Sequence, residues 1–209
     1  NTGQLFKIMA IVINGSGTVT GLSVGGLPDG TVDEDTLAAS SVSATKHKPN
    51  AGSGAILQVL SATQAGTTST TSNGTMVDVS GMSVAITPTA SSSKILVTIN
   101  AMISIDGTNL WFLRALRGST VIGGTSTSSG TSAGHDSFAS AGGQDSGPGS
   151  NGRNVEFPSF TYLDSPSTTS ATTYKLQWCG NSGDTIKLNQ WGIGDDASGS
   201  SSITVMEIA

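Results

Sequence analysis

The clearest structural signal in this sequence is the stretch KILVTINAMISID, residues 94–106, in which apolar and polar side chains alternate. Positions 95, 97, 99, 101, 103 and 105 are all Ile, Val or Ala and fall on one face of an extended chain. Successive side chains of a β-strand point to opposite faces of its sheet. The pattern therefore predicts one long strand with one buried face.

Similar stretches recur from residue 55 to the end of the chain. The further strands that we expect are AILQVLSAT, TMVDVS, MSVAITP, LWFLRALRG, VEFPSFTYLD, TTYKLQWCGN, DTIKLNQ and SITVMEI, with turn sequences such as TSNGT and NSGD between them. Short strands without a helix-period segment predict an all-β fold, an antiparallel β-sandwich or jelly roll, for a head domain over residues 51–209. The Gly- and Ser-rich stretch 123–153 is the exception, because a connection this long is usually a functional or a disordered loop.

The last predicted strand carries apolar side chains on both faces. Ile203 and Val205 lie on one face, and Met206 and Ile208 lie on the other. A strand that is apolar on both sides is normally buried on both sides. One sandwich covers one face, so we expect neighbouring subunits to cover the face with Met206 and Ile208.

Residues 9–50 do not have the pattern of a packed domain. Val19, Leu22 and Val24, for example, stand singly among Gly, Ser and Thr, which is too sparse for one chain to bury a core. We expect a shaft or attachment region that is ordered by other copies of the chain, with a short helix starting at Asp33. Residues 1–8 precede the natural-looking start MAIVINGSG, and we interpret them as an upstream extension or a cloning remnant; cleavage to a true N-terminus is the alternative.

The whole series of segments resembles a known family. MAIVINGSGTVTGLSVGGLPDGTVDEDTLA, GAILQVLSAT, ITPTASSSKILVTINA, TTYKLQWCGNSGDTIKLNQ and SSSITVMEIA follow one another in this order. In this order they are similar to the C-terminal part of bacteriophage tail-fibre proteins, especially those of marine and cyanobacterial phages. The resemblance implies a virion protein that forms homotrimers, with a slender N-terminal region, a head like the jelly roll of tumour necrosis factor, and binding to the host-cell surface.

Composition excludes several classes of function. The net charge of −5 and the lack of clustered Lys and Arg argue against nucleic acid as a partner. No apolar run approaches the roughly 18 residues of a membrane span, and the first residues do not form a signal peptide. We therefore expect that the chain is made in the host cytoplasm and does not insert into a membrane. Cys179 is the single cysteine, which leaves no intrachain disulfide and no Cys-based zinc site.

Catalysis has little support in the sequence. The chain has two histidines, and no GxSxG elbow accompanies its many serines. The GxGxxG match GPGSNG contains a proline, follows no strand and opens no helix, so we interpret it as a chance match. We therefore predict no enzymatic activity, no cofactor and no metal site.

Three places are candidates for receptor contact. His135, Asp136 and Phe138 are candidates for a receptor-contacting loop tip within 123–153, and an inert or poorly ordered loop is the alternative. Trp191 stands at a strand end, where an exposed indole would stack on a sugar or anchor a protein, and packing beneath the loop is the alternative. Asp195 and Asp196 follow in the same loop, either as receptor contacts, as part of an incomplete calcium site or as a solvated turn.

The other aromatic residues point to the core. Trp111 and Phe112 are adjacent, so in a strand they face opposite sides and at least one of them is expected to be buried. Trp178 alternates with Tyr174 and Leu176 and is expected in the core. Cys179 faces the other way, as a small buried or interface residue.

The leading hypothesis is therefore a tail-fibre protein of the virion that binds a glycan or an outer-membrane protein on the host cell. Its N-terminal region is expected to contact other tail or capsid proteins. The alternatives are a capsid decoration or head-fibre protein, and a short polysaccharide depolymerase.

Overall fold

A computed structural model describes residues 12–13, 19–20, 54–124, 135–142, 154–191 and 198–209. The chain divides into two units, residues 1–48 and 49–209. In the first unit β1 (Val12–Ile13) and β2 (Val19–Thr20) pair antiparallel. The helix expected at Asp33 lies outside the described residues. Within the described part of the chain no helix is long and apolar enough to cross a membrane.

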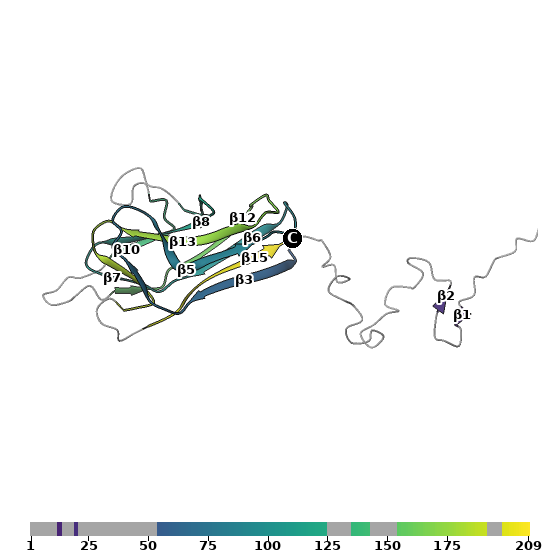
Figure 1. Cartoon of the computed structure of the whole chain (residues 1–209), viewed down its shortest axis with the longest axis horizontal. Coiled ribbons are helices and arrows are strands. Elements are labelled where there is room, and N and C mark those ends of the chain that lie inside the picture. Colours follow the sequence, from purple (N-terminus) through teal and green to yellow (C-terminus); the bar gives the residue numbers. More distant parts are fainter. Residues whose placement is uncertain (1–11, 14–18, 21–53, 125–134, 143–153, 192–197) are drawn as a thin grey trace, which may run out of the picture. The chain divides into compact units, whose positions relative to one another are not determined.

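The second unit is built from three antiparallel sheets (Figure 1). The β15 sheet has the order β12 (Ser159–Asp164), β6 (Lys94–Asn100), β15 (Ser201–Ile208) and β3 (Ile56–Gln64). The β14 sheet has the order β11 (Asn154–Glu156), β7 (Ile103–Asp106), β14 (Thr185–Leu188) and β4 (Thr68–Thr70). The β8 sheet has the order β10 (Ala139–Gly142), β8 (Leu110–Arg117), β13 (Thr172–Gly180) and β5 (Val77–Ile86), with β9 (Thr120–Ile122) also paired to β8.

One hydrophobic core joins these sheets. It includes Ile95, Val97 and Ile99 of β6, which are fully buried, together with Trp178 and Leu176 of β13. The described residues are all-β with antiparallel strand pairs, as the sequence predicts, and the arrangement is consistent with a β-sandwich.

The prediction of a single long strand over residues 94–106 is wrong. The chain forms β6 in one sheet and β7 in another, and the sheets part at residues 101 and 102. The backbone groups at this break are satisfied from outside the ladder: the Ala101 amide donates to the Pro158 carbonyl, and the Met102 carbonyl accepts from the Asn189 amide. Both faces of β7 are buried, so the simple alternation ends there.

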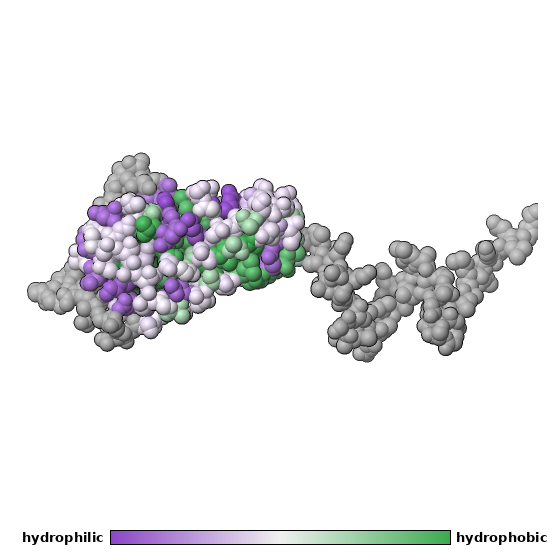
Figure 2. All heavy atoms as spheres, in the orientation of Figure 1, coloured by the Kyte–Doolittle hydropathy of each residue, from purple (hydrophilic) through white to green (hydrophobic). Residues whose placement is uncertain are grey.

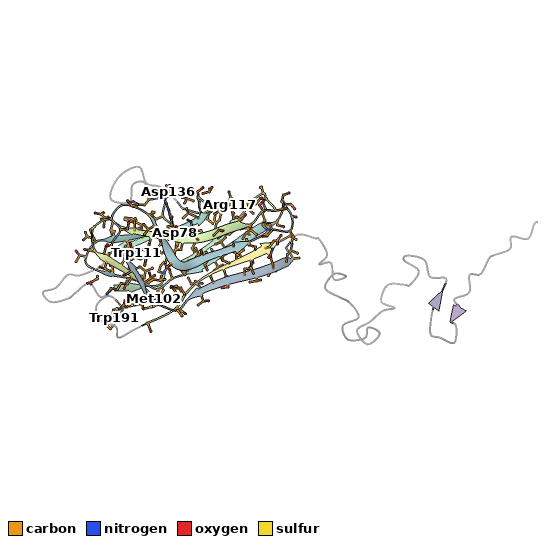
Figure 3. All side chains as sticks on the ribbon, in the orientation of Figure 1. Asp78, Met102, Trp111, Arg117, Asp136 and Trp191 are labelled. Carbon is orange, nitrogen blue, oxygen red and sulfur yellow. The ribbon has the colours of Figure 1, made fainter. Side chains whose placement is uncertain are left out.

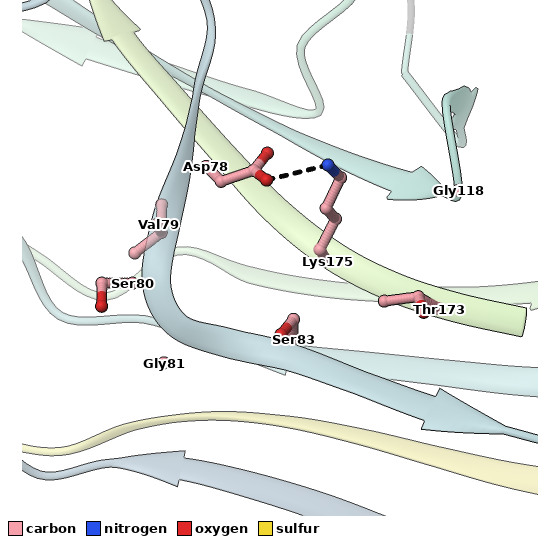
Figure 4. A pocket seen from close by; sticks show the side chains of 8 residues that line it. All are labelled: Asp78, Val79, Ser80, Gly81, Ser83, Gly118, Thr173 and Lys175. Carbon is pink, nitrogen blue, oxygen red and sulfur yellow. Dashed lines mark hydrogen bonds and ion pairs between the residues drawn. The ribbon is translucent and has the colours of Figure 1, made fainter.

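The stretch 123–153 is not structureless throughout. Its residues 139–142 form β10, which pairs with β8 from Ala139 opposite Leu113 to Gly142 opposite Leu110. This strand, β4 and β9 are short and were not anticipated from the sequence. The two predicted strands TMVDVS and MSVAITP are in fact one strand, β5, bent near Gly81 (Figure 4).

The predictions for the aromatic core are confirmed. Trp178 is 2% exposed, and Trp111 and Phe112 are both buried although they face opposite sides of β8. Phe112 is covered on the outside because the His135 ring stacks on it, with centroids 4.3 Å apart. Cys179 lies directly opposite Phe112 and is also buried.

Candidate functional site

The bend in β5 opens a polar pocket of about 440 Å³ (Figure 4). Its lining comes from β5, from β13 and from the turn that follows β8. The lining residues are Asp78, Val79, Ser80, Gly81, Ser83, Gly118, Thr173 and Lys175. Thr173 and Lys175 alternate along β13 with the fully buried Tyr174 and Leu176. The pocket therefore lies on the outer face of the β8 sheet.

A β-bulge makes the bend. Along β13, Lys175 pairs with Ser83 and Gln177 pairs with Asp78, so residues 79–82 of β5 stand opposite one residue of β13. Extra residues in one strand disrupt the ladder and bend that strand. Gly81 takes the left-handed conformation that the bend requires, with a φ of 78°.

Gln64 of β3 supports the bend from beneath. Its Nε2 donates a hydrogen bond of 3.2 Å to the Ser80 carbonyl. A Cβ atom at Gly81 would lie 2.8 Å from the same Nε2, so the backbone packs closely on this amide. A neighbouring strand thus fixes the shape of the pocket wall.

Asp78 is the fixed anion of the pocket. Its Oδ2 accepts from Lys175 Nζ at 2.8 Å, and its Oδ1 accepts from Gln177 Nε2 at 2.6 Å. Arg114 Nε in turn donates to Gln177 Oε1 at 2.8 Å, which orients the amide. The hydrogen bonds from Lys175 and Gln177 lower the pKa of Asp78, so this carboxylate stays ionised near neutral pH.

The lining of the pocket is rich in hydrogen-bonding groups, and its two charged side chains are paired. Lys175 balances the charge of Asp78, and the hydroxyls of Ser80, Ser83 and Thr173 complete its polar lining. Among the described residues no group of three or more His, Cys, Asp or Glu side chains is placed to hold a metal ion. The arrangement suits a polar ligand without net charge.

A second distinctive surface is the outer face of the β15 sheet. Register places four apolar residues side by side across its four strands, because Met206 pairs with Leu96 and Val59, and Leu96 pairs with Leu163. Ile208 and Ile56 extend this row toward the end of the sheet. We call these six residues the apolar band. In Figure 2 hydrophobic atoms gather at the end of the head where β3 and β15 run.

The rest of this face is polar, with one charged residue, Lys94, at its margin beside Ile208. The next row contains Thr161, Thr98, Thr204 and Ser61, and Ser61 and Thr204 share a hydrogen bond of 2.9 Å. Lys94, at the margin, turns its ammonium to Ser165 at 2.7 Å. The described large apolar residues that remain well exposed belong to the edge strands β3 and β12 or directly precede β12: Ile56, Val59, Leu60, Phe157, Tyr162 and Leu163.

Met206 and Ile208 lie in the apolar band and are half-buried within one chain. The opposite face of β15 is fully buried at Ile203 and Val205. β15 is a central strand, paired with β6 on one side and β3 on the other. The expected division of its two faces is thus present, and the role of Met206 and Ile208 in a trimer contact stays a prediction.

The candidate receptor residues do not form one surface. His135 stacks on Phe112, and both its ring nitrogens are buried without a partner among the described residues. Phe138 packs against Phe160, with centroids 4.5 Å apart, so it contributes to the core. Asp136 lies between His135 and Phe138 in the sequence and has a φ of 49°. Receptor contact by this segment stays a prediction.

Trp191 is half-buried at the end of the β14 strand region. In Figure 3 it lies on the side of the head opposite to Asp136. Asp195 and Asp196 lie outside the described residues. None of the candidates that the structure describes lines the polar pocket, which sequence reasoning missed. The available signal was Gly81 inside an alternating stretch, since a glycine there suggests a bulge.

A buried polar cluster joins the two sides of the core and has a structural role. Asp164 of β12 accepts from Tyr174 Oη at 2.7 Å and from Arg117 Nη1 at 2.8 Å. Burial and then the hydrogen bond to Asp164 raise the pKa of Tyr174 far above its usual value, so the phenol stays protonated. Burial raises the pKa of Cys179 to about 11, and its thiol is unreactive near neutral pH.

The comparisons with known proteins give no further assignment: neither a family model nor a curated protein sequence matches this chain.

Proposed function

We propose that this chain is the receptor-binding part of a bacteriophage tail fibre, which forms homotrimers and attaches to a glycan or protein on the bacterial surface. The single observation that carries the proposal is the apolar band on the outer face of the β15 sheet. Contiguous exposed apolar surface of this kind marks an interaction site. The ordered similarity of the sequence to tail-fibre proteins supports its assignment to copies of the same chain.

The strand pairing also supports a jelly roll like that of tumour necrosis factor. The main strands pair as one long folded hairpin: β3 with β15, β5 with β13, β6 with β12, and β8 with β10. Such nested pairing, wrapped into two facing sheets, defines a jelly roll. We propose this topology for the head and a shaft or attachment role for residues 9–50.

In the proposed trimer the band of each subunit, with Met206 and Ile208 at its centre and end, is covered by its neighbours. The face suits self-association because the row next to the band consists of Ser and Thr, and the charged Lys94, which pairs with Ile208 at the margin, turns its ammonium to Ser165. In a three-fold ring each subunit uses different parts of its surface toward its two neighbours, and an apolar band close to the axis can be buried by both of them. Three linked heads bind a surface multivalently, so weak single sites add up to firm attachment.

Two measurements test the proposal together. Native mass spectrometry of the full chain is expected to give three times the mass of 20.9 kDa. Fluorescently labelled protein is expected to adhere to bacterial cells that carry the matching surface structure. A protein that stays monomeric at micromolar concentration, or that adheres to none of a broad panel of bacterial strains, would contradict it.

A further inference from the structure

We propose that the pocket at the bend of β5 binds a neutral saccharide unit, with Asp78 accepting hydrogen bonds from two neighbouring hydroxyls of the sugar. The inference rests on the proposed function, because it names the chemical class of the receptor.

The size fits a small ligand. The pocket encloses about 440 Å³, which lies within the roughly 300–1,000 Å³ of small-molecule sites. Gly81 and Gly118 in its wall bring the main chain to the surface without side chains. A saccharide unit can therefore approach both side-chain and main-chain polar groups.

The charges select an uncharged ligand. Lys175 and Asp78 neutralise each other at 2.8 Å, so a ligand with its own charge would have to displace one partner of the pair. Each carboxylate oxygen of Asp78 accepts one hydrogen bond from the protein, and a carboxylate has about four acceptor sites in total. The remaining sites can accept hydrogen bonds from two neighbouring hydroxyls of a sugar ring, and Lys175 keeps further N–H groups that can donate.

Hydrogen bonds within the protein orient the groups of the site before any ligand arrives. Arg114 orients Gln177, and Gln177 orients Asp78, through hydrogen bonds of 2.8 and 2.6 Å. Gln64 holds the bent backbone at Ser80. Groups that are fixed in advance lose little conformational entropy on binding, which favours the weak, hydroxyl-rich contacts of a saccharide.

The pocket lies away from the face proposed for the subunit contact. Its side chains lie on the outer face of the β8 sheet, whereas the proposed subunit contact uses the outer face of the β15 sheet. Each subunit of a trimer would thus present one saccharide site.

The test is saturation-transfer NMR on the full chain, with the methyl glycosides of glucose, galactose and mannose as probes. Transfer to at least one of these probes is expected. Asp78→Asn replaces an accepting oxygen by a donor and is expected to weaken binding about tenfold. Ser83→Tyr, which fills the pocket from its rim, is expected to abolish transfer. Asp106→Asn removes a comparable exposed carboxylate from β7, outside the pocket, and is expected to change nothing.

The outcomes separate the two proposals. No transfer to any probe, or transfer that both pocket variants leave unchanged, overturns the saccharide site. If the wild-type protein still adheres to bacterial cells in that case, the proposed function stands with another receptor surface. Transfer that is lost in both pocket variants supports the site even if the cell assay fails, and the failure then counts against the tail-fibre function alone.

Discussion

At the scale of single residues, the fold depends on a few buried polar groups that apolar periodicity does not reveal. Asn189 is fully buried, with a left-handed φ of 60°, at the point where the β15 and β14 sheets part. Its Nδ2 donates to the Gln64 and Gly66 carbonyls at 2.6 and 3.0 Å, and its Oδ1 accepts from Ser201 Oγ at 2.5 Å. One side chain thus replaces the ladder bonds missing at the break.

Asn189→Ala is expected to lower the free energy of unfolding by about 3 kcal/mol, because it leaves buried partners unsatisfied and puts Ala, which tolerates the left-handed conformation less well than Asn, at this position. Urea denaturation followed by circular dichroism measures the change. Asn189→Gly keeps the backbone conformation available and isolates the loss of the hydrogen bonds. Wild-type stability in both variants would show that the hydrogen bonds of Asn189 do not stabilise the junction of the two sheets.

Glu207 is the second such residue, fully buried on the inner side of β15. Burial by itself would raise the pKa of Glu207. Its carboxylate, however, accepts hydrogen bonds from Gln58 Nε2 at 2.6 Å and from the amide and hydroxyl of Thr89 at 2.7 Å. These hydrogen bonds outweigh the effect of burial and lower the pKa of Glu207 below the usual 4.5. A lowered folded-state pKa means that the stabilisation is complete above the unfolded value and is lost as the pH falls through the folded value.

The free energy of unfolding is therefore expected to fall as the pH drops below 4.5, and Glu207→Gln is expected to flatten this part of the curve. Denaturation midpoints measured from neutral to acidic pH in both proteins provide the comparison. Lys175→Gln, which acts on the exposed Asp78 pair, serves as a control that leaves the Glu207 contribution in place. An equally steep decline in Glu207→Gln would assign the acid sensitivity to other carboxylates.

At the scale of elements, β15 links the core to the proposed subunit contact. Its inner face is covered by one chain, while Met206 stands in the middle of the apolar band. Met206→Asp is expected to weaken subunit association more than tenfold, since a charge would be buried in an apolar contact. Sedimentation velocity measures the association, and circular dichroism checks that the β-fold is retained.

Ser140→Asp is the matched control for this prediction, because Ser140 is exposed on β10 in another sheet and is expected to leave association unchanged. If Met206→Asp assembles as tightly as the wild type, the outer face of the β15 sheet is not the subunit contact.

At the scale of the whole molecule, assembly and stability are expected to be coupled. A state that unfolds together with its dissociation has a melting temperature that rises with protein concentration. Differential scanning calorimetry over about a hundredfold range of concentration is expected to show this rise in the wild type and a much smaller one in Met206→Asp. A melting temperature that is independent of concentration in both proteins would favour a monomeric head.

The sequence by itself determined the all-β class and most strand positions, because alternation with a period of two is a local property of the chain. It also indicated that Trp178 and Cys179 are buried and that the two faces of β15 differ, for the same reason. These statements need only the direction of successive side chains along one strand.

The tertiary structure alone decided where strands bend, where sheets part and which distant groups meet. The break between β6 and β7 involves Asn189 and Pro158, and the bulge in β5, although Gly81 hints at it, is held by Gln64 of β3, so distant residues take part in both. Asp78 and Lys175 are 97 residues apart in the sequence, and strand pairing brings their side chains together. Register between strands is a cooperative result of burying one common core, and it therefore placed both the pocket and the apolar band, which no single strand could specify.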